Sequence, residues 1–427
     1  MKEKNKRKIK VEDRWLKLDN AALIYPSAQN NEWNAVFRIS VKLKEKIVPS
    51  ILQDSLDETL NRFPQFNMSL KRGIFWYYFQ NRRTFPNVSK EILHPCQKIE
   101  LGSYNHLFRV LYYDKKISFE AFHSLTDGTG ACAFMECLIT SYLMKCGNKL
   151  DLKKINYSPL DKANEEEIED SFIRYADLKE RSKHTGEKAF KLVGTKEDRG
   201  ILNVVTGEIE VENLKEIAKR YDATITEFLA GLYFKSMLIS QKDYNLKNKP
   251  FIISIPINLR KYFDSKTLRN FSNFINVKLE NKYFESELSE IINIVKEQMK
   301  QINKDYLMKN INSNVHAQKN FFVRVLPLWI KNFALSFSYS KFGENLYTTN
   351  FSNLGNINIS DEFIPFVDKF EFLIGSPKYN GVNFSVISFN GKAELTFTSS
   401  IKEKKIEREF FRLLSSLGGK ITLSSNI

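Results

Sequence analysis

The stretch Ile117–Gly130, ISFEAFHSLTDGTG, carries the clearest local pattern of this 427-residue chain. Alternation places Ile117, Phe119, Ala121 and His123 on one face of a predicted strand, because successive side chains of a strand point to opposite faces. The chain then turns at its Asp-Gly pair, and residues 129–145 have the pattern of a helix. The sequence therefore predicts a strand, a tight turn and a helix, with a histidine at the strand end.

This turn has a chemical interpretation. His123 would stand on the apolar side of the strand end, where partial desolvation keeps an imidazole neutral and able to accept a proton near pH 7. Asp127 or Thr129 would cap the helix, and Gly128 leaves space where a Cβ would obstruct a ligand or a neighbouring backbone. The alternative is a satisfied core histidine beside an ordinary Asp-Gly turn. A match to HxxxDG arises by chance in roughly one chain of this composition in a hundred.

On the N-terminal side of this stretch, strand and helix patterns alternate. Strands are expected over Ala35–Val41, Gly73–Phe79 and Phe108–Tyr113, and the last should pair with Ile117–His123 as a hairpin. A helix is expected over Ile47–Phe63, where apolar residues recur at helical spacing. These elements favour a mixed α/β fold for the first part of the chain.

On the C-terminal side, a charged segment from Asp161 to about Gly200 interrupts the pattern. We expect a crossover there, with residues 1–165 as an N-terminal half, 166–200 as a linker and 201–427 as a C-terminal half. The Asn390-Gly391 pair is a strong hairpin signal. The expected elements of the second half are strands over Ile201–Ile209, Phe251–Ile257, Val382–Ser388 and Ala393–Ser399, and helices over Val211–Tyr221, Thr224–Leu238 and Glu407–Leu417.

The composition is that of an ordinary folded protein, with 42% hydrophobic and 27% charged residues. There are 65 basic and 50 acidic residues, a net charge of +15. This excess either attracts phosphate-bearing partners or reflects a lysine-rich composition spread over the surface, and the dispersed lysines favour the second interpretation. The exception is MKEKNKRKIK at residues 1–10, expected to be a solvated tail. No nucleic-acid-binding motif is present, so no nucleic-acid partner is expected.

Four cysteines form no CxxC pair, which is typical of reduced thiols in a cytoplasmic protein. No secretory signal and no membrane-spanning run are expected. The nearest candidate is Phe321–Tyr339, which is broken by Arg324, Pro327 and Lys331. We expect a buried or half-buried helix there; the alternative is an apolar lip for a substrate or for a membrane surface. The expected location is the cytoplasm, with peripheral membrane contact left open.

Four segments resemble a known family. HSLTDG at His123–Gly128 resembles the HxxxDG signature of the chloramphenicol-acetyltransferase-like superfamily of thioester-dependent acyltransferases. Ser254–Asn270, SIPINLRKYFDSKTLRN, is similar to the segment whose arginine pairs with the motif aspartate, and Asn350–Gly355, NFSNLG, is similar to the SNLG segment. Trp15–Pro26, WLKLDNAALIYP, also resembles the family opening. The similarity is strongest to bacterial alcohol-acetyltransferase-like proteins, relatives of condensation domains and of mycobacterial polyketide-associated acyltransferases.

The resemblance implies two similar halves forming a pseudo-dimer, with α/β structure, mixed sheets and a tunnel between them. It implies that His123 is the general base and that Asp127 is structural, paired with Arg260. For Arg260 the alternative is a surface pair with Lys261. The implied donor is an acyl-coenzyme A, acetyl-coenzyme A first, and the implied acceptor is a small alcohol or amine. The many aromatic residues suggest an apolar channel and an apolar acceptor; the alternative is that they build an ordinary core.

The tetrahedral oxyanion of such a reaction needs a hydrogen-bond donor. Ser352 matches the serine of the SNLG segment and is the first choice, with Asn353 and Asn350 as alternatives. The competing interpretation of these residues is a polar turn held by Gly355. Gly128, Asn350 and Asn353 are also the expected substrate-binding residues.

Two departures from the family limit the interpretation. Phe122 stands where condensation domains and many relatives carry a second histidine, which argues against a peptide-forming condensation domain. The DFGWG segment of the plant acyltransferases is absent. The leading interpretation is therefore an O- or N-acyltransferase that uses acyl-coenzyme A, without a metal and as a monomer. The alternatives are an acyltransferase that takes its acyl group from a carrier protein, and a non-catalytic binding module on the same fold.

Overall fold

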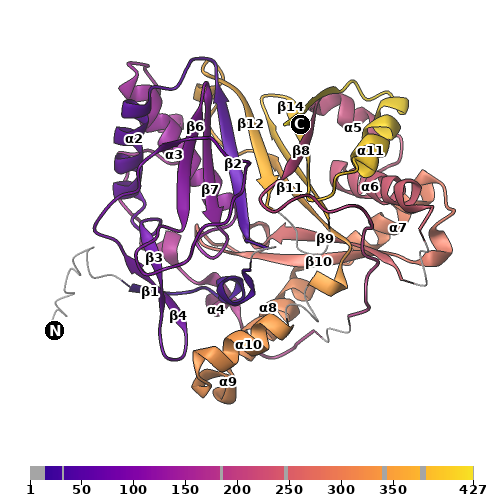
Figure 1. Cartoon of the computed structure of the whole chain (residues 1–427), viewed down its shortest axis with the longest axis horizontal. Coiled ribbons are helices and arrows are strands. Elements are labelled where there is room, and N and C mark those ends of the chain that lie inside the picture. Colours follow the sequence, from indigo (N-terminus) through magenta and orange to yellow (C-terminus); the bar gives the residue numbers. More distant parts are fainter. Residues whose placement is uncertain are drawn as a thin grey trace.

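Two groups of sheets and helices lie side by side in the computed structural model (Figure 1). The structure describes residues 15–30, 33–182, 186–244, 249–338, 344–375 and 381–426. The basic segment of residues 1–10 lies outside the described residues. The mixed α/β fold class with mixed sheets is confirmed, because parallel and antiparallel strand pairs occur in the same sheets.

A five-stranded sheet forms the centre of the first half. Its strands follow the order β12-β2-β7-β6-β5, with bounds Val367–Ile374, Val36–Leu43, Lys116–Phe122, Phe108–Tyr113 and Ser89–Lys90. The predicted hairpin of β6 and β7 is present and pairs Phe108 with Ala121. Helices α2 (Pro49–Arg62) and α3 (Gly128–Lys145) cover one face of this sheet (Figure 1). The apolar periodicity of α2 predicts its one buried side, whereas α3 is buried on nearly all sides.

A seven-stranded sheet forms the centre of the second half. Its order is β10-β9-β11-β13-β14-β8-β15, with bounds Ser272–Leu279, Phe251–Asn258, Thr349–Asn356, Val382–Phe389, Lys392–Ser399, Asn203–Glu210 and Thr422–Ser425. The predicted β13–β14 hairpin turns at Asn390 and Gly391, whose φ angles are 47° and 79°. Both lie in the left-handed region that such a two-residue turn requires.

The remaining helices surround these sheets. Helix α6 (Ile225–Gln241) begins with a capping box between Thr224 and Glu227. The other α-helices are α1 (Tyr25–Ala28), α4 (Ser171–Tyr175), α5 (Val211–Lys219), α7 (Leu288–Lys300), α8 (Lys304–Lys319), α9 (Phe321–Val325), α10 (Leu328–Ser338) and α11 (Lys405–Ser416). Short 3₁₀ helices span Ala21–Leu23, Leu152–Lys154, Glu165–Ile168, Leu259–Lys261, Asn281–Tyr283, Glu344–Leu346 and Asp361–Phe363.

A third, small sheet corrects one prediction. It has the order β1-β4-β3, with bounds Trp15–Lys17, Tyr77–Asn81 and Met68–Arg72. The single strand expected over Gly73–Phe79 is wrong, because its first four residues form the turn of the β3–β4 hairpin. There the Gly73 amide donates to the Trp76 carbonyl over 3.0 Å. A Cβ on Gly73 would lie 2.6 Å from that same oxygen, so glycine permits the tight turn.

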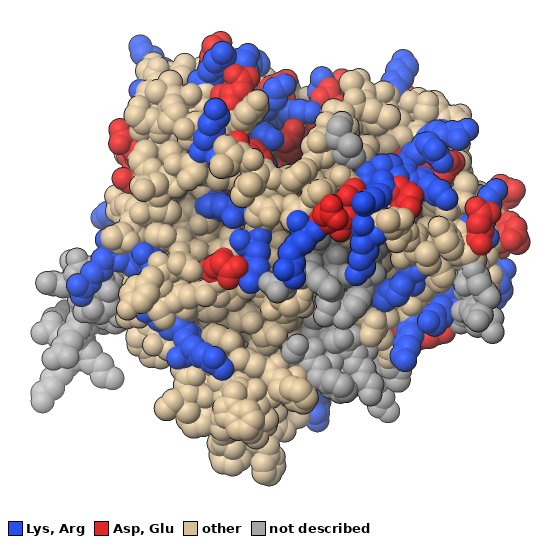
Figure 2. Space-filling model, in the orientation of Figure 1, with Lys and Arg blue, Asp and Glu red and all other residues tan. Residues whose placement is uncertain are grey.

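The single buried or half-buried helix expected over Phe321–Tyr339 is wrong in its continuity and in the exposure of its aromatic residues, although α10 buries Leu328 and Lys331. Proline ends the first helix, so the segment forms two short helices, α9 and α10; Tyr339 lies outside the described residues. Phe322 and Phe333 are 76% and 77% exposed. Basic and acidic residues intermix over much of the molecular face in Figure 2, but the end formed by α9 and α10 is almost entirely uncharged. Among the helices of the described residues, none combines the length and hydropathy needed to cross a bilayer.

Strand β12 and the crossover segment both join the halves. Strand β12, from the C-terminal part of the chain, pairs antiparallel with β2 and completes the first sheet while it packs against β13 and β14. In the crossover segment, the buried Glu167 side chain accepts from both terminal nitrogens of Arg62 on α2, over 2.8 and 2.6 Å. Its backbone carbonyl accepts from the Leu268 amide of the second half over 2.7 Å. The boundaries 1–165, 166–200 and 201–427 stay a prediction.

Candidate active site

His123 directly follows β7 and lies where the two halves meet. Its backbone amide donates to the Ala35 carbonyl over 2.8 Å, which continues the β2–β7 ladder by one residue. The imidazole stacks on the Tyr25 ring at a centroid distance of 4.7 Å and an angle of 17°. Phe37 flanks it at 5.1 Å. The histidine is half-buried, and its ring is held between two aromatic side chains.

The contact to Asn270 determines which ring nitrogen carries the proton. Asn270 Oδ1 lies 3.0 Å from His123 Nδ1. The amide is oriented by its other end, because Nδ2 donates to Asp19 Oδ2 over 3.3 Å and to the Ser124 carbonyl over 3.4 Å. An amide oxygen only accepts, so Nδ1 carries the hydrogen and the lone pair is on Nε2. This is the tautomer that a base acting through Nε2 requires.

A second group of buried contacts supports Asn270. The Asp19 carboxylate is fully buried, accepts from the Ala22 amide over 2.8 Å and faces Arg269 at 3.5 Å. Burial raises the pKa of Asp19, and the Arg269 charge opposes that rise. Arg269 Nη2 donates to the Lys17 carbonyl, so the opening segment of the chain is fixed against the second half. These contacts leave the Asn270 amide little freedom to turn.

The environment of His123 favours the neutral imidazole. Desolvation by burial lowers the pKa of His123 below its ordinary value of 6.5. The charge of Asp127 and the contact to Asn270 oppose this shift without reversing it. The ring is therefore uncharged at neutral pH and able to accept a proton.

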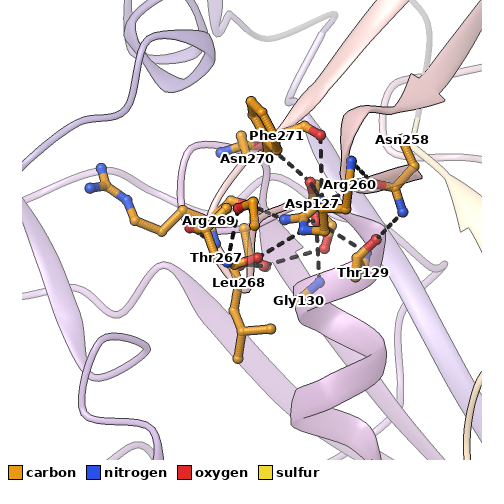
Figure 3. A network of polar contacts seen from close by, with 12 residues as sticks. Asp127, Thr129, Gly130, Asn258, Arg260, Thr267, Leu268, Arg269, Asn270 and Phe271 are labelled. Carbon is orange, nitrogen blue, oxygen red and sulfur yellow. Dashed lines mark hydrogen bonds and ion pairs between the residues drawn. The ribbon is translucent and has the colours of Figure 1, made fainter. Parts of the chain in front are cut away.

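Asp127 caps helix α3 and joins it to the second half. Its Oδ1 accepts from the Thr129 and Gly130 amides over 3.1 and 3.2 Å, the N-cap arrangement expected of an aspartate before a helix. Its Oδ2 accepts from Arg260 Nη1 over 2.8 Å and from the Phe271 amide over 2.9 Å. Figure 3 places the carboxylate between the first turn of α3 and the 258–271 segment. The expected ion pair of Asp127 with Arg260 is present, and donors surround both oxygens.

Arg260 is half-buried and bound to Asp127 rather than paired with Lys261 at the surface, since its side chain is 11% exposed. Nε donates to the Thr267 carbonyl over 2.8 Å and Nη2 to the Arg269 carbonyl over 2.6 Å. The guanidinium thus shapes the loop that carries Asn270 while it binds Asp127 (Figure 3). One arginine therefore fixes both the helix cap and the partner of the histidine.

Two glycines allow the halves to approach closely. A Cβ on Gly130 would lie 2.1 Å from the Leu268 carbonyl oxygen, so this position accepts no larger residue without backbone movement. A Cβ on Gly128 would lie 2.7 Å from Leu354 Cδ2. Leu354 belongs to a bulge in β11, where the register with β13 shifts and Gly355 has a φ of 68°. The SNLG and HxxxDG segments therefore pack directly against each other.

A cavity of about 640 Å³ lies at this junction. Strands β2 and β12 of the first sheet and β9, β10 and β11 of the second contribute to its wall. The predicted site residues on the wall are His123, Asp127, Gly128, Asn350, Ser352 and Asn353. Arg260 lies behind the wall, bound to Asp127. The fold thus brings together residues from distant segments of the chain around one histidine.

The three candidates for the oxyanion donor differ in their contacts. Asn353 Nδ2 donates to Thr226 Oγ1 over 3.0 Å and its Oδ1 accepts from the Gly355 amide over 2.8 Å, so this side chain holds the β11 bulge. Asn350 Nδ2 donates to Asn383 Oδ1 over 3.1 Å. The Ser352 hydroxyl has no hydrogen-bond partner among the described residues. Its hydrogen is available to a ligand in the cavity.

Sequence reasoning missed Asp19, Tyr25 and Asn270 as site residues. All three lie in segments that resemble the family, Trp15–Pro26 and Ser254–Asn270, so the resemblance contained a signal for them. What was missing was the contact of Tyr25 and Asn270 with His123 and of Asp19 with Asn270; the His123–Asn270 contact joins residues 147 positions apart. Phe122, where relatives carry a second histidine, is fully buried against Tyr25. Across the part of the chain that the structure describes, no cluster of His, Cys, Asp and Glu is arranged to hold a metal ion.

Comparisons with known proteins identify the fold. No family model and no curated protein sequence matches the chain. Among solved structures it is similar to the trichothecene 15-O-acetyltransferase from Fusarium sporotrichioides, with a TM-score of 0.59 and 12% identity over 96% of this chain and 97% of that one. It is also similar to TRI101 from F. sporotrichioides in complex with coenzyme A and T-2, with a TM-score of 0.62 and 11% identity over 93% and 97%.

A third similar structure is the first condensation domain of the CDA synthetase, with a TM-score of 0.58 and 11% identity over 95% of this chain and 96% of that domain. At these identities the comparisons establish the fold alone. The chain has the two-halved fold of condensation domains and chloramphenicol-acetyltransferase-like acyltransferases over nearly its whole length.

Proposed function

We propose that this protein is an acyltransferase that moves an acyl group from a coenzyme A thioester to a hydroxyl or amine acceptor, with His123 as general base. We propose further that it is closest to the bacterial alcohol-acetyltransferase-like branch. The observation that carries the proposal is the state of His123: a neutral imidazole on the cavity wall whose Nδ1 is bound by Asn270. Its Nε2 has no partner among the described residues and is left to accept a proton.

The proposed reaction needs one proton carrier. His123 Nε2 takes the proton of the acceptor hydroxyl while the acceptor oxygen forms a bond to the thioester carbonyl carbon. The carbonyl electron pair moves to its oxygen, and this oxyanion accepts a hydrogen bond from Ser352 Oγ. When the pair returns, the carbon–sulfur bond breaks and the imidazolium returns the proton to the sulfur. The products are an ester and a free thiol; an amine acceptor gives an amide by the same steps.

Asp127 has a positioning role in this proposal. Five hydrogen bonds from Thr129, Gly130, Phe271 and Arg260 occupy its carboxylate, so its oxygens are bound by the protein although the residue contributes to the cavity wall. Its contacts keep the turn after His123 fixed against the second half. The carboxylate acts on the reaction through the position and the charge environment of the imidazole.

The donor and acceptor assignments rest on the fold and the cavity. One structure similar to this chain contains coenzyme A, and another is a condensation domain, so a phosphopantetheine arm on a carrier protein is the alternative donor. Both donors present the same thioester. The proposed acceptor is apolar, because Trp33, Phe37 and Phe274 contribute to the cavity wall.

Release of free thiol tests the proposal. The protein is incubated with acetyl-coenzyme A and a panel of alcohols and amines, and products are identified by mass spectrometry. His123→Ala should reduce thiol release by about 10²–10⁴-fold, the usual contribution of a general base. His94→Ala is the matched control, since His94 is exposed and does not line the cavity; it should keep the wild-type rate.

Each other outcome has a defined meaning. Equal rates for wild type and His123→Ala would refute the role of the histidine. If thiol is released only from an acylated carrier protein, the carrier protein is the donor in place of coenzyme A, and the role of His123 is unchanged. Tight binding of a thioester without any release would identify a binding module and refute the enzyme proposal.

A further inference from the structure

The end of the molecule formed by α9, α10 and the tip of the β3–β4 hairpin carries a cluster of exposed apolar side chains. We call it the apolar cap; it comprises Ile74, Phe75, Phe321, Phe322, Trp329 and Phe333. Ile74, Phe322 and Phe333 are 76–77% exposed, and Trp329 is 67% exposed. The cap lies at the lower end of the molecule in Figure 2, where the visible face has no acidic residue. Large exposed apolar clusters of this kind mark interaction surfaces.

Helix α10 turns two polar side chains, Lys331 and Asn332, toward the protein together with Leu328, while its large aromatic residues face outward. Lys331 is buried, and its Nζ donates to the Phe75 and Arg324 carbonyls over 2.9 and 3.1 Å. Asn332 Nδ2 donates to the Tyr77 hydroxyl over 2.9 Å. Trp329 and Phe333, one turn apart, point to solvent. Helices on a protein surface normally expose polar residues, so the outward position of Trp329 and Phe333 favours an apolar environment outside the protein.

Hydrogen bonds make the apolar cap a rigid surface. The Leu328 amide donates to the Ile74 carbonyl over 2.8 Å, which fixes α10 to the hairpin tip. Lys331 Nζ lies 3.6 Å from the centre of the Trp76 ring, and this cation–π contact stabilises the same junction. The apolar side chains are therefore displayed by fixed backbone elements.

The charge around the apolar cap favours an anionic surface. Residues 68–77 and 319–335 contain no acidic residue and five basic ones: Lys71, Arg72, Lys319, Arg324 and Lys331. Of these, Arg72, Lys319 and Arg324 are exposed beside the cap. Aromatic side chains bordered by cations match the interface of a bilayer that contains anionic lipid.

We propose that the apolar cap docks the protein on the surface of a membrane that contains anionic lipid, with Trp329 and the phenylalanines inserted at the headgroup level. The docked orientation would also determine how far the candidate active site lies from the membrane. Helix α1 packs against α10 and carries Tyr25, whose ring stacks on His123. If the proposed function holds, the site would lie close to the membrane surface and an apolar acceptor could come from the bilayer.

Co-sedimentation with lipid vesicles tests this proposal on the full chain. Wild-type protein should bind vesicles of phosphatidylcholine with phosphatidylglycerol, bind pure phosphatidylcholine more weakly, and dissociate as salt is added. The double variant Phe322→Ser/Phe333→Ser should lose at least about tenfold in vesicle partitioning, because two aromatic side chains no longer leave water. Ile92→Ser/Leu93→Ser is the matched control, since both residues are exposed but lie outside the cap; it should bind like wild type.

Three results would overturn the proposal. They are absence of vesicle binding by the wild type, equal binding by the cap variant, and a wild-type dimer in sedimentation velocity that the cap variant converts to a monomer. The last would show that a second copy covers the apolar cap. Thiol release from acetyl-coenzyme A with a water-soluble alcohol should be equal in wild type and cap variant. Its absence in both would refute the proposed function and leave the vesicle result standing.

Discussion

Two buried carboxylates flank His123, Glu120 in strand β7 and Asp127 after the turn, and they differ in what they connect. Glu120 Oε1 accepts from Arg38 Nε over 2.7 Å and from the Cys96 amide over 2.6 Å, while its Oε2 accepts from Arg109 Nε over 2.6 Å. All of these partners belong to the first half. The partners of Asp127 come from both halves, the α3 amides on one side and Arg260 with the Phe271 amide on the other.

The difference shows that two carboxylates within eight residues of sequence, each paired with arginine, stabilise different parts of the structure. Burial opposes the charge of Glu120, but the guanidiniums of Arg38 and Arg109 outweigh it and lower the pKa of Glu120. This carboxylate holds the sheet together on the face of β7 opposite Ala121. Asp127 instead joins the halves at the point where the histidine needs a fixed position.

The largest expected effects come from removing each negative charge. Asp127→Asn leaves the Arg260 guanidinium, whose side chain is 11% exposed, without its counter-charge, which costs about 3–5 kcal/mol of unfolding free energy. Glu120→Gln should cost less, because Arg38 keeps its ion pair with Glu91 and Arg109 is partly exposed. Urea denaturation measures both. Only Asp127→Asn should also reduce thiol release per folded molecule. An equal loss of rate in Glu120→Gln would remove the distinction between the two carboxylates.

A smaller effect is expected at Asn270. Asn270→Ala removes the acceptor that holds His123 in the Nδ1–H tautomer, and partners that orient a histidine are typically worth about 10–100-fold in activity. Thiol release should fall by that factor while the folded protein persists. Asn67→Ala is the control, since Asn67 is also buried and donates to the Arg82 carbonyl, away from the cavity. If both variants lost activity alike, Asn270 would have no specific role.

The smallest effect is a shift of the pH profile. In the proposed mechanism the neutral imidazole is the active form, and the lowered pKa of His123 predicts that wild-type activity falls with an apparent pKa below 6.5. The Asp127 charge raises the pKa of His123, so Asp127→Asn should move the fall to still lower pH. Glu120→Gln should leave the midpoint in place, since Glu120 does not act on His123. A shift to higher pH in Asp127→Asn would contradict the electrostatic account.

Short-range sequence patterns predicted the strand, turn and helix that surround His123. The strand, turn and capped helix around His123 lie within a short stretch, and alternation and the Asp-Gly pair specify them. The Asp127–Arg260 pair was available only through resemblance, because the partners are 133 positions apart. The contacts of Asp19 and Asn270 had no local pattern at all. They depend on how the opening segment packs against the second half.

At the apolar cap, sequence-based prediction failed for a different reason. The prediction for Phe321–Tyr339 assumed that apolar residues are buried, and the α10 backbone places Lys331 inside and Trp329 outside instead. Strand β11 was also missed, because its composition is not typical of a strand. Its sequence TNFSNLGN is rich in asparagine and small residues, which are depleted in strands, and only the parallel pairing with β9 and β13 fixes it.

The protonation state of His123 is the central claim, and nitrogen NMR of protein labelled at its histidine rings measures it directly. His123→Ala identifies the His123 signals among those of the five histidines. The account predicts a neutral Nδ1–H tautomer at pH 7 that becomes protonated only below pH 6.5. An Nε2–H tautomer, or an imidazolium at pH 7, would contradict it.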